Sequence, residues 1–221
     1  MSEALPIRRR FTLLGTLSVA GAVAFVPLLS ASAPSPPPAG LVAFVVVSST
    51  ISLIAGWLGL RWADQADLPM PLLRGFETGA LVAPTRASLA RAAAIGLAIG
   101  AMGIVALRLA RAPSGGGTLA ARLASALFAA VTLELVLHLA VMSGVVRMTR
   151  GRVGTGILAA AAAYLAFHLS TLGGQPAGVI AAAIVGNGLA GLLFGWLYAR
   201  DGFEYLIVAH LIAHATAVGF G

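Results

Sequence analysis

The sequence contains no cysteine and no lysine, and only 10% of its 221 residues carry a charge. The lack of cysteine excludes disulfide bonds, thiolate catalysis and cysteine-based metal sites. A soluble domain usually has about 25% charged residues, which form much of its water-facing surface. A chain with so few charges cannot build such a surface, and this excludes the class of soluble globular domains.

Hydrophobic residues, in contrast, make up 59% of the chain and fall in long runs. A helix that crosses a bilayer needs about 20 consecutive apolar residues. We therefore predict an all-α, polytopic transmembrane helix bundle with seven spans, at residues 11–30, 40–60, 88–109, 119–146, 153–172, 178–199 and 204–220. Gly191 and Gly195 have the spacing of small residues that let neighbouring membrane helices approach closely.

The breaks between the apolar runs divide the chain into three regions. Residues 1–10 form a polar tail, and residues 11–114 hold the first three spans with one sizeable polar loop at 61–87. Residues 115–221 hold the last four spans, which form the expected functional core.

The fourteen basic residues are all arginines, and most lie at the ends of predicted spans. With the amino terminus in the cytoplasm, only Arg108, Arg111 and Arg122 lie outside, which leaves eleven inside. The positive-inside rule thus favours an inner amino terminus and an outer carboxyl terminus, in the cytoplasmic membrane of a bacterium or archaeon. The net charge of +7 is explained by the arginines that set this orientation, and binding of nucleic acid is not expected.

The amino terminus also has features of a secretory signal. Three arginines, at 8–10, precede the apolar run from Phe11 to Leu29, and residues 31–33 resemble a cleavage site. We favour an uncleaved membrane anchor, because the run has about the length of a span and further spans follow.

Five titratable side chains lie deep within the predicted spans. Burying such a group in hydrocarbon costs about 2.5–3.5 kcal/mol on insertion scales, so it needs a partner or a function. The five are one carboxylate and all four histidines of the chain: Glu134, His138, His168, His210 and His214. We expect them to meet in one pocket, with membrane lipid around it.

The spacing of these residues fits a shared pocket. Glu134 and His138 are four residues apart and share a helix face, and the same holds for His210 and His214. His168 follows Tyr164 by four residues on a third helix. Three helices can therefore direct one carboxylate and four imidazoles toward a common point.

Two of these pairs resemble motifs of a known family. The segment from Gly188 to His210 is similar to the end of CPBP-family proteins, the type II CAAX prenyl endopeptidases and their bacterial relatives, also called the ABI family. Tyr164 and His168 match the family's aromatic-xxx-His motif. His210 and His214 match its HxxxN or HxxxD motif, with histidine at the last position. The resemblance covers residues 119–220.

The first family motif, EExxxR, is only partly present. In an alignment without gaps, Leu133 occupies the first glutamate position, Glu134 the second, and His138 that of the arginine. In the family the first glutamate is taken to activate water, and leucine cannot accept a proton. For Glu134 to replace it, the helix would have to turn, because one residue along an α-helix rotates a side chain by about 100°.

The resemblance implies an intramembrane endopeptidase that hydrolyses a peptide bond in or near the bilayer. Its substrate would be a peptide or a membrane protein, and no cofactor is expected. A prenylated CAAX substrate is not implied, because bacterial-type members share the fold without it. Glu134 or His168 would activate water, and His210 with His214 would stabilise the oxyanion. His138 and Tyr164 would be binding or structural residues.

Two alternatives remain open at this point. Leu133 favours a catalytically degenerate pseudoprotease that binds a peptide or confers immunity to one. The carboxylate and the imidazoles are also plausible ligands of a divalent metal ion. These alternative ligands are Glu134, His138, His168, His210 and His214.

Overall fold

The computed structural model describes residues 6–30, 37–80, 82–109, 118–170 and 172–220. All of the regular elements among these residues are helical, and all seven predicted spans are confirmed as helices. The helices are α1 (Pro6–Ser30), α2 (Pro38–Gln65), α3 (Pro71–Thr78), α4 (Arg86–Leu109), α5 (Leu119–Phe128), η1 (Ala129–Leu133), η2 (Leu135–Met142), α6 (Ser143–Met148), α7 (Val153–Ser170), α8 (Ala177–Asp201) and α9 (Phe203–Phe220).

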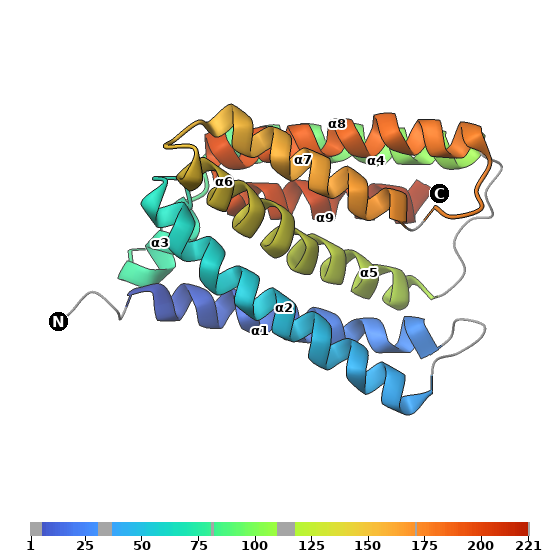
Figure 1. Cartoon of the computed structure of the whole chain (residues 1–221), viewed down its shortest axis with the longest axis horizontal. Coiled ribbons are helices and arrows are strands. Elements are labelled where there is room, and N and C mark those ends of the chain that lie inside the picture. Colours follow the sequence, from blue (N-terminus) through green and yellow to red (C-terminus); the bar gives the residue numbers. More distant parts are fainter. Residues whose placement is uncertain (1–5, 31–36, 81, 110–117, 171, 221) are drawn as a thin grey trace.

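Six of the described helical segments are long and apolar enough to cross a membrane. The last helix, α9, is shorter, with an apolar stretch from Phe203 to Ala217. The long helices run roughly along one axis, with α1 and α2 on one side and α4, α7 and α8 on the other (Figure 1). The segment from α5 to α6 and the helix α9 lie between these groups, so the core forms around them.

The polar loop predicted at 61–87 contains helical structure in two places. The helix α2 continues to Gln65, and Pro71 begins the short helix α3, which Gly79 ends with a left-handed φ of 73°. Proline suits the first turn of a helix because the amide hydrogen that it lacks would have no partner there. Two acidic side chains of this region, Asp64 and Glu77, bind Arg10 of α1.

The short helix α3 is held by the first and the last helix of the bundle. Arg10 of α1, only 4% exposed, donates two hydrogen bonds to Asp64, and its Nε lies 2.9 Å from Oε2 of Glu77. On α9, Oε1 of Glu204 accepts the backbone N–H of Leu73 at 2.6 Å. Burial raises the pKa of the Glu77 carboxyl above its ordinary value, and Arg10 acts in the opposite direction.

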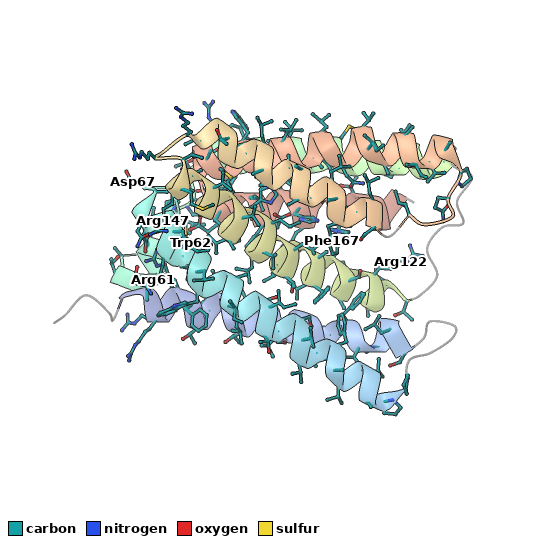
Figure 2. All side chains as sticks on the ribbon, viewed as in Figure 1. Arg61, Trp62, Asp67, Arg122, Arg147 and Phe167 are labelled. Carbon is teal, nitrogen blue, oxygen red and sulfur yellow. The ribbon has the colours of Figure 1, made fainter. Side chains whose placement is uncertain are left out.

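Basic side chains gather at the end of the bundle where α1 begins. Figure 2 shows Arg61 and Arg147 at this end, and Arg122 at the opposite end. The arginines labelled in Figure 2 are therefore divided unevenly between the two ends of the bundle.

A second ion pair joins α4 to the end of α8. Asp201 accepts hydrogen bonds from Ser88 at 2.8 Å and from Nε of Arg91 at 2.8 Å. A hydrogen bond to a charged group contributes about 1.5–3 kcal/mol.

We therefore expect Asp201→Asn to lower the free energy of unfolding by about 1–3 kcal/mol, because it removes this charge-assisted network. Equilibrium unfolding in mixed detergent micelles would measure the change. The matched control is Asp67→Asn, since Asp67 is 97% exposed and asparagine also tolerates its positive φ. If Asp201→Asn lowered the free energy of unfolding no more than Asp67→Asn does, the structural role of the ion pair between Asp201 and Arg91 would be contradicted.

Close helix packing depends on small residues at two interfaces. A Cβ on Gly191 would lie 2.8 Å from the Cα of Ala161, and one on Gly195 would lie 3.1 Å from Ile157. The predicted close approach at Gly191 and Gly195 is thus confirmed, and the partner helix is α7. A second close interface, between α4 and α9, involves Gly96 and Gly100.

Candidate functional site

The helix that carries Glu134 departs from α-helical geometry around this residue. The segments η1 and η2, on either side of Glu134, are π-helical and together extend from Ala129 to Met142. In a π-helix each N–H bonds to the carbonyl five residues back, so a turn contains an extra residue and the side chains change face. The face on which the side chains of this helix lie therefore changes near Leu133 and Glu134, where the sequence departs from the EExxxR motif.

The Glu134 carboxylate is completely buried and binds two imidazoles. Nδ1 of His210, on α9, is hydrogen-bonded to Oε1 at 2.5 Å, and Nδ1 of His138 is hydrogen-bonded to Oε2. Nε2 of His138 donates in turn to the carbonyl oxygen of Gly191 on α8, at 3.2 Å. One hydrogen-bonded network thus connects the central helix with α8 and α9.

Tyr164, on α7, lies at the centre of the aromatic part of the site. Its ring centroid is 4.3 Å from that of His168 and 6.1 Å from those of His138 and His210. Nδ1 of His168 donates to the backbone carbonyl of Tyr164 at 2.9 Å. The spacing of four residues thus orients the His168 ring through the backbone of its own helix.

The His210 ring is held between two parallel neighbours. His214 stacks on it with centroids 4.9 Å apart and an interplanar angle of 11°. Phe194, from α8, stacks on it at 5.0 Å and 24°. The orientation of His210 is therefore fixed by a hydrogen bond at one edge and by ring stacking.

The structure brings all the predicted site residues together. Glu134, His138 and His210 bind one another directly, His168 joins them through Tyr164, and His214 joins them through His210. Sequence reasoning missed Phe194 and the carbonyl of Gly191. The close-packed pair Gly191 and Gly195, which flanks Phe194, was the available signal for both.

A divalent metal ion is the second alternative that the sequence leaves open. Among the described residues, no three histidine, aspartate or glutamate side chains converge as a metal would require. Both nitrogens of His138 and Nδ1 of His210 and of His168 take part in hydrogen bonds. Coordination through these atoms would break the bonds that hold the network.

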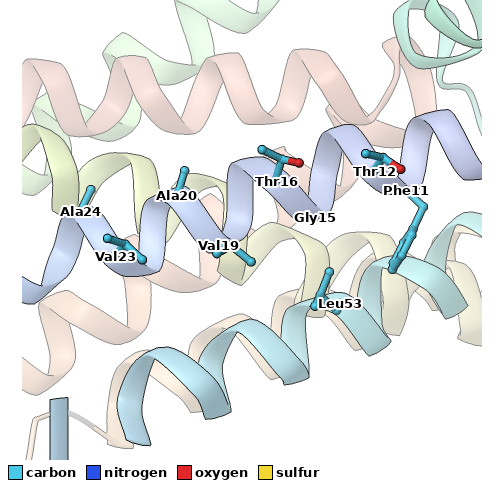
Figure 3. Close-up of a pocket in the computed structure, with 9 residues that line it drawn as sticks. All are labelled: Phe11, Thr12, Gly15, Thr16, Val19, Ala20, Val23, Ala24 and Leu53. Atoms are coloured by element: carbon cyan, nitrogen blue, oxygen red, sulfur yellow. The ribbon is translucent and has the colours of Figure 1, made fainter. Parts of the chain in front are cut away.

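An apolar groove lies apart from this site. It is open, has a volume of about 750 Å³, and follows one face of α1 from Phe11 to Ala24, with Leu53 of α2 on its other wall (Figure 3). None of the titratable residues of the site lines it. It is therefore a feature of the outer helices and not an entrance to the network.

Comparisons with known proteins identify the region that carries the site. No curated protein and no solved structure matches the chain. The model of the family described as type II CAAX prenyl endopeptidase Rce1-like matches residues 115–216. This range includes every predicted site residue and agrees with the extent of the resemblance predicted from the motifs. The chain is thus an integral membrane protein whose residues 115–216 are similar to the Rce1-like family of type II CAAX prenyl endopeptidases.

Proposed function

We propose that the chain is an intramembrane endopeptidase that hydrolyses a peptide bond in or near the bilayer. The observation that carries this proposal is the buried Glu134 carboxylate, bound by His138 and His210 within the region that matches the family. Buried titratable groups in a membrane span are costly, so a network of this kind indicates a functional site.

The arrangement contains the groups that peptide hydrolysis needs. A neutral imidazole can take a proton from water, and a carboxylate can orient the imidazole and stabilise its cation. Imidazole N–H groups can stabilise the oxyanion that forms at the substrate carbonyl. We assign these roles to Glu134, His168, His210 and His214, while His138 and Tyr164 support them.

Activity of the full-length chain in proteoliposomes would test the proposal. The probes are a farnesylated CAAX peptide and an unprenylated apolar peptide, with cleavage followed by mass spectrometry. We expect cleavage of one of them, and a loss of about 10²–10⁴-fold in rate for Glu134→Gln and for His168→Ala, because general acid–base groups contribute about this much. Ser170→Ala, on the exposed end of α7, is the control for handling and insertion.

If the single variants Glu134→Ala, His168→Ala and His210→Ala all cleaved the probe at the wild-type rate, the peptidase proposal would be contradicted. Binding of a probe without turnover would support the second candidate, a pseudoprotease that recognises peptides. That candidate is favoured by Leu133, whose apolar side chain packs against the hydrophobic core where the family motif has its first glutamate.

A further inference from the structure

The number of protons in the buried network follows from its hydrogen bonds. Three bonds connect His210 to Glu134, Glu134 to His138, and His138 to the carbonyl of Gly191. Each bond needs one proton, and the carbonyl oxygen can only accept. Three protons are the number carried by one neutral glutamic acid and two neutral histidines. With no proton on Nε2 of His210, which lies outside these three bonds, the network therefore has a net charge of zero, wherever the shared protons lie.

Neutrality agrees with the position of the network in the bundle. Glu134 and His138 are 0% exposed, and His210 is 3% exposed. An uncompensated charge at such a site costs several kcal/mol by the usual estimates. In the resting state, the hydrogen-bonded network of Glu134, His138 and His210 therefore has no net charge.

One ring nitrogen of this set is left out of the hydrogen bonds between the described residues. Both ring nitrogens of His138 and Nδ1 of His210 take part in these bonds. Nε2 of His210 has no hydrogen-bond partner among the residues that the structure describes, and His210 alone of the three keeps some exposed surface. When Nδ1 of an imidazole donates to a carboxylate, Nε2 carries the lone pair and the carboxylate stabilises the cation.

We propose that Nε2 of His210 is the general base of the peptidase reaction and that Glu134 is its positioning residue. This inference rests on the proposed function. It reverses the role that the family resemblance implies for His210, namely donation of a hydrogen bond to the oxyanion. It also explains how the site works with leucine at position 133, because no second glutamate is then needed.

The reaction step balances without a further reactant. Nε2 takes a proton from water, the water oxygen forms a bond to the substrate carbonyl carbon, and the π electron pair of that carbonyl moves to its oxygen. The positive charge on His210 and the negative charge on the oxyanion form at the same time, so the site stays neutral. The Nε2 proton then passes to the amide nitrogen as the C–N bond breaks, which leaves a carboxylic acid and an amine.

His168 is the competing base, and its surroundings differ. Its Nδ1 donates to the carbonyl of Tyr164, which is neutral, whereas Nδ1 of His210 donates to a carboxylate. A carboxylate stabilises an adjacent imidazolium more strongly than a neutral carbonyl does. The titratable side chains around His210 are Glu134, His138, Tyr164, His168 and His214. Of these, Glu134 is the carboxylate, and it is bonded directly to Nδ1 of His210.

Two measurements on the full-length chain in lipid nanodiscs would test the proposal. The first is nitrogen NMR of ¹⁵N-labelled histidine, with His210→Gln used to assign the signals. We expect His210 to be neutral, with a proton on Nδ1 and none on Nε2. A resting proton on Nε2 would overturn the proposal, because the base would then have no lone pair.

The second measurement is the cleavage rate of His210→Gln with the probes named above. The glutamine amide can still donate a hydrogen bond to an oxyanion but cannot act as a base. We expect a loss of about 10²–10⁴-fold, with an unfolding temperature close to that of the wild type. A loss of less than tenfold would overturn the base assignment and leave the peptidase function standing. A wild type that cleaves neither probe would overturn both.

The role of Glu134 has its own test in Glu134→Gln. The glutamine can keep both side-chain bonds, by accepting from His210 and donating to His138, but it has no negative charge. We expect an unchanged His210 tautomer together with a rate loss of about 10²-fold or more. An unchanged rate would show that the charge of Glu134 has no part in the reaction.

Discussion

Glu134→Leu is expected to lower the free energy of unfolding by about 3–5 kcal/mol, the usual cost of removing one partner from a buried polar pair. The substitution would leave Nδ1 of both His138 and His210 buried without an acceptor. Glu134→Gln is the matched control, because it preserves an acceptor for one ring and a donor for the other, and we expect it to stay close to the wild type. Equilibrium unfolding in mixed micelles would give both values.

A double substitution separates the network from simple packing. In a Glu134→Leu background, His138→Leu removes one of the two stranded donors, and we expect it to restore part of the lost stability. A double variant that is less stable by the full sum of the two single losses would mean that the two side chains do not interact. That result would contradict the hydrogen-bonded network on which the site depends.

Gly96→Ala is expected to lower the free energy of unfolding by about 1–3 kcal/mol, as overpacking of a close interface does. The new Cβ would lie 2.5 Å from the carbonyl oxygen of Ala209 and 2.8 Å from Cβ of Ile212, both on α9. The clash would push α9 away from α4 at the residue next to His210. We therefore also expect a lower cleavage rate, measured with the same probes.

The control for this variant lies on the same helix. A Cβ on Gly103 meets nothing within 4 Å, so Gly103→Ala should only add helix propensity, by up to about 1 kcal/mol. The two alanine variants should thus shift stability in opposite directions. Equal shifts would mean that α4 and α9 are not in close contact.

The positions of the membrane helices were predictable because long apolar runs leave few alternatives. The segments that the sequence could not place are those whose conformation depends on distant partners. The helix α3 is one example, since the N–H of Leu73 is bound by Glu204, and Glu77 is bound by Arg10. The close interface of α4 with α9 is another, because Gly96 and Gly100 indicate a small-residue face but not its partner.

The meeting of the polar side chains in one site also followed from the sequence, since hydrocarbon disfavours each of them alone. The detailed geometry did not. Residues 129–142 have no local signal for a π-helix, and the predicted helical span at 119–146 did not specify one. The conformation accompanies the bond between Glu134 and His210, which lie 76 residues apart. The roles of the individual residues remain predictions that the experiments above address.

The attachment of α3 has a consequence for biogenesis. A ribosome delivers the chain from its amino terminus, so Arg10 and Glu77 can associate early. The N–H of Leu73, in contrast, must wait for Glu204, which is synthesised 131 residues later. During co-translational assembly, α9 thus docks on a helix that was synthesised much earlier.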